Sequence, residues 1–270
     1  MPVGLEGFRI LELAEGLGAA YAGRLLAQYG AEVVKIEPPT GDAARHHDLV
    51  GEGAPDPERS ALFHHLNGGK RSVVADLSTG EGRRGILELA GAADIVLEDF
   101  GPNRLDNLGM GWEHWHERYP AAWRVSLSPF GSYGPYAGYR LTPLTAYAVG
   151  GQMYMTGDPD RPTVQYGFQG DYQAGLHGFS ASVLALHQAT LGRAGQRIEI
   201  ATMEVEASQT EEMAPHASIH DHLSRLRLGN KLGALWSFYP AADGWMGIFG
   251  IHPNFRQVAE TLDMLEIVDG

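Results

Sequence analysis

The sequence predicts an α/β protein with a mostly parallel sheet, helices on both of its faces, and the start of a small second domain. Two observations support this prediction. Strand-like apolar runs alternate with helix-like segments up to about Gln209, an alternation typical of parallel sheets that are covered on both faces. After Gln209 the alternation ends and the chain becomes polar and helical, which indicates a change of domain.

The first three elements form a strand–helix–strand unit. Phe8–Leu13 is a short apolar run, and Ala19–Tyr29 carries helix formers up to Gly30, which we expect to cap the helix in the left-handed conformation. Ala31–Ile36 follows as a second strand and is ended by Pro38. Such a unit implies parallel pairing with a right-handed crossover.

Strands and helices continue to alternate along the chain. Further strands are expected at Ser72–Leu77, Asp94–Leu97, Ala122–Leu127 and Arg197–Ile200. Helices are expected at Thr79–Gly91, Leu141–Val149 and Gln173–Leu191, and Gly101–Trp112 reads as a turn-rich connection.

The domain boundaries follow from the point at which strand-like and helix-like segments cease to alternate. We expect a large domain over 1–208, a helical linker over 209–228 and the beginning of a small, incomplete domain over 229–270. The linker helix lies within Glu211–Leu228, with Pro215 in its first turn. In the small domain, Leu235–Tyr239 and Trp245–Phe249 flank an Ala-Asp-Gly turn and predict a hairpin. A last helix is expected at Pro253–Leu262.

Composition narrows the class of protein. With 20 basic and 33 acidic residues the net charge is −13, which disfavours non-specific binding to nucleic acid or anionic membranes. The absence of cysteine excludes disulfides, thiolate metal sites and a cysteine nucleophile. No apolar run approaches the roughly 20 residues of a membrane span, and the first residues lack the features of a secretory signal. We therefore expect a soluble, cytoplasmic protein with neither nucleic acid nor membrane as partner.

A glycine-rich turn at Gly16–Tyr21 resembles a dinucleotide fingerprint, with Glu37 roughly where a ribose-binding acid would stand. Its third small position is occupied by Tyr21, which is too bulky for the close helix–strand packing that the fingerprint requires. A tight strand–helix turn explains the glycines better, and no NAD is expected.

Two other polar patterns have simple explanations. His216 and His220 share a helix face at a spacing that can bind a divalent cation, but no glutamate directly follows His216 and a solvated helix face explains the pair equally well. No metal site is expected. Lys70 and Arg71 form a basic pair that is either solvated or available to a phosphate.

Gly170-Asp171 is the sharpest local signal, just before the helix expected at Gln173–Leu191. Taken alone, Asp171 is most simply a helix N-cap whose carboxylate accepts backbone N–H groups, a contact worth about 1 kcal/mol. The same geometry would keep the carboxylate ionised, which is what covalent catalysis by a carboxylate needs. Capping and catalysis are therefore compatible.

Five separated segments together resemble one family. They are Gly30–Asp42, Asn67 to Ser72, Ala93–Phe100, Gly170-Asp171 and Gly192 to Arg197. In order and spacing they are similar to the class III CoA-transferases, the formyl-CoA and carnitine CoA-transferase (CaiB/BaiF) family, over residues 4–250.

This resemblance implies a Rossmann-like, CoA-binding large domain over 1–208 and a dimer of two interlocked rings. It also implies that Asp171 is the nucleophile. Its carboxylate would attack an acyl-CoA thioester to give an acyl–aspartyl anhydride, and CoA would return to form an aspartyl-CoA thioester that an acceptor acid then attacks. CoA and acyl-CoA are then substrates, with a carboxylic acid as the second partner.

The resemblance also implies a set of CoA contacts. They fall on Leu17, Gly18, Pro38, Ala75, Asp76, Leu77, Asp99, Phe100, Gly101, Asn107, Leu108 and Arg140. Pro38 and Asn107 stand where the family has basic residues, so part of the charge that pairs with CoA phosphates is missing. Leu17 replaces a glutamine of the first turn, which argues against a donor held as in formyl-CoA transferase.

Two alternatives share the fold. An α-methylacyl-CoA racemase would need a histidine close to Leu141–Thr142, and none is present there. A non-catalytic CoA-binding subunit, completed by a partner chain, is the other alternative, so the expected assembly is a homodimer or such a heteromer. Aromatic residues close to the nucleophile region favour an apolar acyl group: Tyr166, Phe168, Tyr172, Trp236 and Phe238.

Overall fold

The computed structural model describes residues 4–47, 56–210, 218–219, 231–233, 236–249, 255–261 and 263. The chain divides into two compact units, one formed by residues 1–150 and 166–209 and the other by residues 151–165 and 210–270. The first unit holds the large sheet, and the second holds smaller sheets and short helices.

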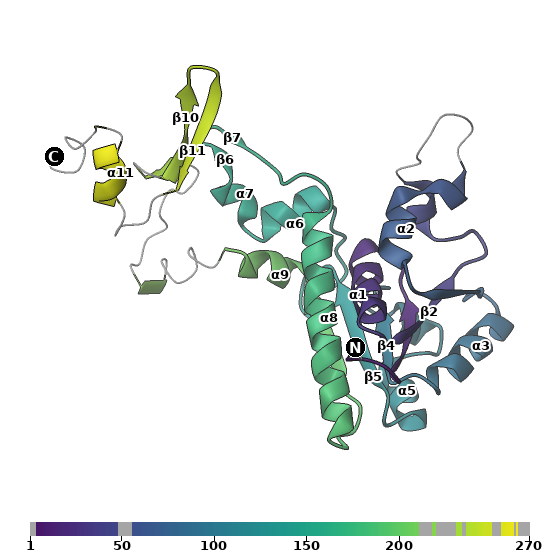
Figure 1. Cartoon of the computed structure of the whole chain (residues 1–270). Helices are drawn as coiled ribbons and strands as arrows, with labels where there is room; N and C mark the ends of the chain where they lie inside the picture. The colour runs from purple at the N-terminus through teal and green to yellow at the C-terminus, as the bar shows by residue number, and fades with distance from the viewer. Residues whose placement is uncertain are drawn as a thin grey trace. The chain divides into compact units, whose positions relative to one another are not determined.

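A six-stranded sheet forms the centre of the first unit (Figure 1). Its strands are β1 (Arg9–Leu13), β2 (Glu32–Glu37), β3 (Arg71–Val74), β4 (Ile95–Glu98), β5 (Trp123–Ser128) and β8 (Arg197–Ala201). All neighbours pair in parallel, in the order β3-β2-β1-β4-β5-β8. The chain thus builds outward from β1 to one side and then from β4 to the other, as in the Rossmann fold, with the switch point between β1 and β4. The predicted parallel sheet is confirmed.

Helices cover both faces of this sheet, as predicted. One face packs against α1 (Leu17–Gln28), α2 (Ala61–Asn67) and α8 (Gln169–Thr190). The other packs against α3 (Gly80–Ala90), α4 (Arg104–Asn107) and α5 (Trp112–Arg118). Successive strand residues point to opposite faces, so Ile10 is buried in the first layer and Leu11 in the second.

The first strand–helix–strand unit forms as predicted, with α1 starting two residues earlier than expected. α1 ends in a Schellman motif: Gly30, at φ 99°, donates its N–H to the Ala27 carbonyl at 3.0 Å, and Ala31 donates to that of Leu26 at 3.1 Å. Glycine suits this position because the left-handed conformation disfavours a side chain.

Other elements differ from the prediction for local reasons. β3 ends at Val74, opposite Glu37, because Pro38 has no N–H with which to continue the ladder; residues 75–77 therefore lie in the connection. The connection 101–112 contains α4, and the sequence did not predict α2 or α5, whose seven residues are too few to show a helical period.

A buried ionic cluster ties the turns after β1 and β2 together. Nζ of Lys35 lies 3.0 Å from Oε1 of Glu12 and 2.7 Å from Oδ2 of Asp42, and Nζ of Lys70 lies 2.7 Å from Oε2 of Glu12. All four side chains are nearly inaccessible. Lys70 is therefore a structural cation and not a solvated or phosphate-facing one. A Cβ at Gly23 would collide with Oε2 of Glu12, so the glycine leaves room for the cluster.

Two short 3-10 helices follow β2, at Ala43–His46 and Pro57–Arg59.

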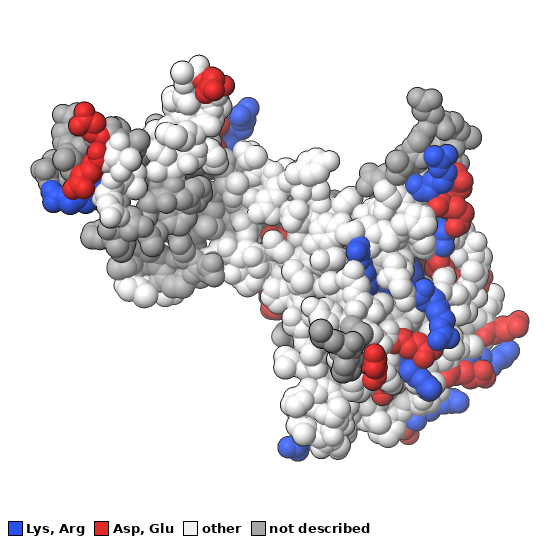
Figure 2. All heavy atoms as spheres, viewed as in Figure 1, with Lys and Arg blue, Asp and Glu red and all other residues white. Residues whose placement is uncertain are grey.

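Within the described ranges, no helix combines the length and apolar character that a bilayer crossing requires. On the face of the first unit shown in Figure 2, acidic and basic side chains are interspersed.

The second unit contains the predicted hairpin. β10 (Trp236–Ala241) and β11 (Gly244–Phe249) are antiparallel around Ala242 and Asp243, and β9 (Lys231–Gly233) adds an unpredicted third strand. α11 spans Phe255–Thr261, inside the helix predicted there. The helix expected within 211–228, with Pro215, lies almost wholly outside the described residues.

Residues 151–165 depart from the expected division of the chain, because they group with the second unit and not with 1–208. Here α7 (Gln152–Met155) precedes a two-stranded antiparallel pair, β6 (Gly157–Asp158) and β7 (Arg161–Pro162). The segment pairs with itself and adds no strand to the parallel sheet.

Candidate active site

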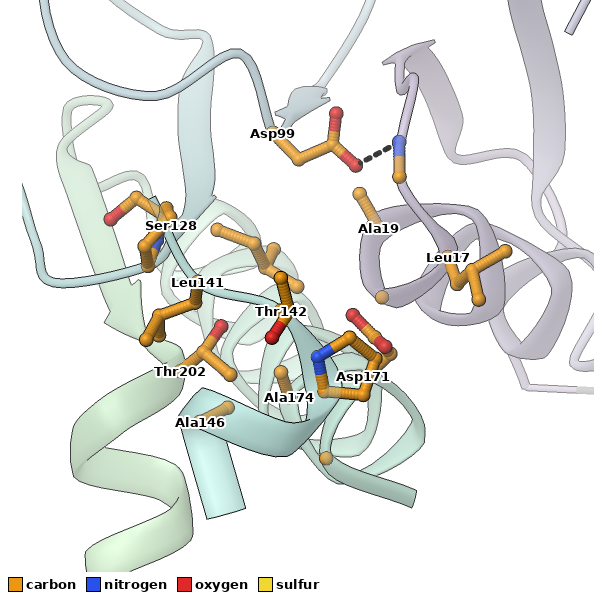
Figure 3. Close-up of a pocket in the computed structure, with 16 residues that line it drawn as sticks. Leu17, Ala19, Asp99, Ser128, Leu141, Thr142, Ala146, Asp171, Ala174 and Thr202 are labelled. Atoms are coloured by element: carbon orange, nitrogen blue, oxygen red, sulfur yellow. Dashed lines mark hydrogen bonds between the residues drawn. The ribbon is translucent and has the colours of Figure 1, made fainter. Parts of the chain in front are cut away.

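A cavity of about 200 Å³ opens at the carboxyl ends of β1, β4, β5 and β8, within the first unit (Figure 3). Besides these strand ends, the first turns of α6 (Pro143–Val149), α8 and α9 (Thr202–Ser208) line it. The lining residues are Gly16, Leu17, Gly18, Ala19, Asp99, Leu127, Ser128, Pro129, Leu141, Thr142, Pro143, Ala146, Gly170, Asp171, Ala174 and Thr202. This is the switch point of the sheet, where open α/β folds bind their ligands.

Glycines allow α1 and α8 to approach each other closely beside this cavity. A Cβ at Gly18 would lie 3.1 Å from the carbonyl oxygen of Asp171, and one at Gly175 would lie 2.6 Å from that of Gly18. Tyr21, which occupies the third small position of the dinucleotide fingerprint, packs edge-on against Tyr172 with ring centroids 4.9 Å apart. The first glycine-rich turn therefore serves a helix–helix contact, which brings Asp171 next to the N-terminus of α1.

Backbone N–H groups are the source of partial positive charge in the described cavity lining, which also contains Asp99 and Asp171. Its lining contains no Lys, Arg or His among the described residues. Leu17, Gly18 and Ala19 form the first turn of α1, and Gly170 and Asp171 belong to the first turn of α8. The first N–H groups of a helix lack intrahelical partners and carry partial positive charge. An acidic protein can thus present a cavity that accepts negative charge.

Asp171 lies in the first turn of α8 but does not cap it, so the N-cap prediction is wrong. The helix begins at Gln169, after Phe168, because the N–H of Tyr172 already bonds the carbonyl of Phe168 at 3.0 Å. The carboxylate of Asp171 accepts no hydrogen bond from the described residues, and burial raises its pKa above the usual range. The expectation of a carboxylate held ionised by capping is therefore also wrong.

Asp99 clasps the turn between β1 and α1. Its two carboxylate oxygens accept hydrogen bonds from the N–H groups of Glu15 and Gly16, both at 2.8 Å. The dashed line in Figure 3 marks the bond from Gly16. Burial raises the pKa of Asp99 to about 7, although these two hydrogen bonds oppose the rise. A Cβ at Gly16 would lie 2.8 Å from the same carboxylate, so this pair of hydrogen bonds depends on the glycine.

Glu206 is a carboxylate near the site that the sequence did not single out. It lies on α9, is 2% exposed, and would collide with a Cβ placed on Gly170. Burial, together with the charge of Asp171, raises the pKa of Glu206. A usable signal was its position just after a predicted strand, since the residues that follow parallel strands gather at one edge of the sheet.

The predicted CoA contacts all fall in connections that follow the carboxyl ends of strands β1 to β5. Leu17, Gly18 and Asp99 line the cavity with Asp171. The remaining contacts lie farther along the same edge: Pro38 after β2, Ala75, Asp76 and Leu77 after β3, Phe100, Gly101, Asn107 and Leu108 after β4, and the exposed Arg140 after β5. Their assignment to CoA stays a prediction.

Glu37 is not available to a ribose. Its carboxylate accepts hydrogen bonds from Nε and Nη2 of Arg45, at 2.8 and 3.0 Å, and from Oγ of Ser72 at 2.6 Å. Burial alone would raise the pKa of Glu37, but these partners lower it to about 2. The second element of the dinucleotide fingerprint is thus committed to a structural ion pair.

Among the described residues, no histidine or aromatic side chain lines the cavity. His177 is exposed on α8, with Nδ1 3.0 Å from the carbonyl oxygen of Gln173. Tyr166 is 96% exposed, and Tyr172 packs on Tyr21, so the hint of an aromatic acyl pocket finds no support at these positions. His216 and His220 lie outside the described residues, within which no cluster of three or more potential metal ligands occurs.

The fold and the site define a Rossmann-like α/β protein with a carboxylate-bearing cavity at its switch point. The family model of CoA-transferase family III matches residues 5–268. The chain therefore belongs to this family, which confirms the resemblance inferred from the five segments.

Relatives that are named as CoA-transferases agree with this assignment. The chain is 34% identical, over 98% of its length, to a succinyl-CoA–D-citramalate CoA-transferase of Chloroflexus aurantiacus, of which it covers 66%. It is 32% identical to a succinate–glutarate CoA-transferase of Agrobacterium fabrum, with 98% of this chain and 68% of that protein covered. The chain thus spans about two thirds of the length of these relatives.

A solved structure shows the same fold. The chain superposes on a CaiB/BaiF family protein from Brucella suis with a TM-score of 0.85 and 30% identity, covering 100% of this chain and 72% of that one.

Proposed function

We propose that this chain provides the CoA-binding domain and the nucleophile of a CoA-transferase, which moves CoA from an acyl-CoA donor to a carboxylic acid. One observation supports this most strongly. Asp171 places a desolvated carboxylate, without a hydrogen-bond partner among the described residues, in a cavity formed by helix N-termini. Family membership and the names of the relatives point to the same reaction.

In the first step an oxygen of the Asp171 carboxylate attacks the thioester carbonyl carbon of the donor. The C–S bond breaks, its electron pair leaves with the CoA thiolate, and Asp171 becomes part of an acyl anhydride. Burial favours this step because a poorly solvated carboxylate has a raised pKa and is more basic.

The thiolate then attacks the aspartyl carbonyl of the anhydride. The donor acid leaves as a carboxylate, and Asp171 carries CoA as a thioester. The acceptor carboxylate attacks this thioester and releases CoA once more, and CoA finally takes the acceptor acyl group, which restores the free carboxylate of Asp171. A carboxylate suits this exchange because it attacks and leaves with comparable ease.

Each attack forms a tetrahedral oxyanion that needs stabilisation. Backbone N–H groups at the start of α1, around Gly18, and at the start of α8 are the groups that this cavity offers. Preorganised donors of this kind stabilise developing negative charge without reorganisation during the reaction.

We assign the CoA nucleotide to the connections after β2, β3 and β4, along the carboxyl edge of the sheet. This edge is where parallel α/β sheets bind phosphate-bearing ligands. The predicted contacts there include Pro38 and Asn107, which carry no charge. Succinyl-CoA is the first donor to test, because the relative from Chloroflexus aurantiacus is named for it.

Covalent trapping tests this proposal directly. The chain is incubated with succinyl-CoA, with and without hydroxylamine, and its intact mass is measured. We expect a mass increase for the acyl- or CoA-enzyme, conversion of one aspartate to a hydroxamate, and its location at Asp171 by peptide mapping. The absence of any adduct at Asp171 across a panel of acyl-CoAs would favour the non-catalytic CoA-binding subunit.

The racemase alternative receives no support from the cavity. Leu141 and Thr142 line it at the place where a racemase needs a histidine, and the nearest histidine on α8, His177, is exposed and does not line it.

We further propose that the chain works as a homodimer or in a heteromer. Exposed aromatic residues support this: Tyr133 is 82% exposed, and the exposed Tyr136 and Tyr139 contact Phe130 in the connection after β5. Apolar surfaces of this kind usually mark contacts with other chains. Sedimentation should show a mass above that of one chain, and a monomer that persists at high concentration would contradict the proposal.

A further inference from the structure

Glu206 is a buried carboxylate next to the proposed nucleophile, and it takes no part in the proposed reaction steps. α9 begins at the carboxyl end of β8, and its first residue, Thr202, lines the cavity. Glu206 stands four residues later on the same face of the helix. Its side chain is 2% exposed, so it is not a solvated surface charge.

Two glycines leave the space that Glu206 fills. A Cβ at Gly170 would collide with Oε1 of Glu206, so the carboxylate lies against the residue that precedes Asp171. A Cβ at Gly150, which follows α6, would collide with the Cβ of Glu206. The side chain of Glu206 is therefore held between the end of α6 and the first turn of α8.

No positive charge or donor compensates Glu206 within the described part of the chain. Its carboxylate takes part in no hydrogen bond or ion pair there. α6 carries no charged residue, and its one titratable group is the buried Tyr147. The two charged residues of β8, Arg197 and Glu199, pair with each other.

The charge that faces Glu206 is that of Asp171. On α8 the other titratable groups are Tyr172, which packs on Tyr21, His177, which is exposed and bonded to a backbone carbonyl, and His187 in the last turn. On α9 itself Glu204 is exposed. The raised pKa of Glu206, caused by burial and by Asp171, agrees with this geometry.

We propose that Glu206 is a positioning residue that favours the acylated forms of Asp171, an inference that rests on Asp171 being the nucleophile. Two nearby carboxylates in a poorly solvated site disfavour each other when both are ionised. Attack on the thioester turns Asp171 into a neutral anhydride, while the negative charge leaves with the CoA thiolate. The repulsion is therefore present in the free enzyme and absent in the anhydride and in the aspartyl-CoA thioester.

This difference has two measurable consequences. Removing the charge of Glu206 stabilises the free Asp171 carboxylate, which lowers the pKa of Asp171 and its tendency to become acylated. The acidic limb of the pH profile of kcat/KM, which reports ionisations of the free enzyme, then moves to lower pH. The fraction of enzyme carrying CoA at steady state falls at neutral pH.

The test is Glu206→Gln, which keeps the shape and removes the charge, with Glu204→Gln as the matched control on the same helix. For Glu206→Gln we expect the acidic limb to move down by about one pH unit and the CoA-enzyme fraction, measured by intact mass, to fall about tenfold. Glu204→Gln should leave both unchanged. A Glu206→Asp variant keeps the charge and should retain the wild-type limb.

Several results would overturn the inference. An unmoved acidic limb in a folded Glu206→Gln variant would make Glu206 merely structural, even if the rate fell. If that variant does not fold, ¹³C NMR of the Asp171→Asn variant replaces it: the carboxyl of Glu206 should titrate at lower pH than in the wild type, and an equal pH would refute the coupling. A wild-type chain that forms no adduct at Asp171 would instead sink the proposed function itself.

Discussion

Two groups of buried charges in the same unit are built in opposite ways. In the ionic cluster at the turns after β1 and β2, Glu12 and Asp42 are each paired with a lysine at 2.7 to 3.0 Å. At the switch point, Asp171 lines the cavity and Glu206 lies against the neighbouring Gly170, and no cation pairs with either carboxylate within the described residues. The first arrangement is electrically neutral, whereas the second concentrates charge of one sign.

The two groups also differ in what they do to pKa values. Burial alone would lower the pKa of both lysines: for Lys35 the carboxylates of Glu12 and Asp42 outweigh burial and raise the pKa, whereas for Lys70 burial prevails over the opposing effect of Glu12 and lowers it. For Asp171 and Glu206 no described partner opposes the effect of burial, so both pKa values rise. A buried charge with a partner of opposite sign is stabilised by that partner, whereas a buried charge without one is costly, and such groups with shifted pKa values cluster at functional sites.

The largest expected effect is on catalysis. Asp171→Ala should lower the rate of CoA transfer by at least about 1,000-fold, because it removes the attacking group, and should leave CoA affinity within a few-fold. Steady-state transfer assays and equilibrium binding of CoA measure the two quantities. A variant that retains more than about 1% of the rate would refute the assignment of the nucleophile, and Glu113→Gln, at an exposed position on α5, serves as the control.

Breaking the paired cluster should affect stability and not chemistry. Lys35→Met leaves the carboxylate of Asp42 buried without its ion-pair partner, and loss of one member of a buried pair costs about 3–5 kcal/mol. Urea unfolding followed by circular dichroism measures the loss. Arg71→Met, which removes an exposed pair with Glu32, should cost no more than about 1 kcal/mol. Equal losses for the two variants would erase the contrast between them.

Low pH should reduce the free energy of unfolding through protonation of Glu37, which pairs with Arg45. Its folded-state pKa of about 2 lies below its unfolded value of 4.5, so the carboxylate contributes stability above pH 4.5 that is lost as the pH falls toward 2. The full contribution is about 3 kcal/mol. Unfolding free energies between pH 6 and 3 should fall less steeply in Glu37→Gln than in the wild type. Parallel pH dependences would show that Arg45 does not stabilise the ionised form.

The smallest expected effect is on proton exchange. In deuterated water, 2-methylacyl-CoA should gain little or no α-deuterium, while label moves between free acid and CoA ester. Racemisation needs a base and an acid on opposite faces of the α-carbon, and no histidine lines the described cavity. Mass spectrometry measures the deuterium content of the ester. Rapid deuterium incorporation without exchange of the acid would make the racemase alternative correct.

Particular elements show how far the sequence could be interpreted. The strand–helix–strand unit with Gly30 was predictable because apolar period and turn chemistry are local properties. The shortest helices were not, since seven residues carry no clear period. The N-cap role of Asp171 was wrong because the first turn of α8 closes on Phe168, two residues before Gly170, which local pattern alone does not reveal.

The residues that carried the family resemblance illustrate a second limit. Glu37, Asp42 and Lys70 belong to its conspicuous segments, yet the structure uses them in buried ion pairs. Glu206 belongs to none of these segments and nevertheless lies against the residue preceding Asp171. A recognisable motif can therefore mark the scaffold of a site as well as its chemistry.

By itself the sequence determined the α/β class, the parallel pairing of the early strands, the family and the choice of Asp171 as the candidate nucleophile. It could do so because periodicity, turn residues and motif order are properties of the linear sequence. Only the tertiary structure decided which charges are paired and which are not. That outcome depends on the distance between groups far apart in sequence and on their shared loss of water, as for Glu12 with Lys70 and for Asp171 with Glu206. Burial and proximity are properties of the fold.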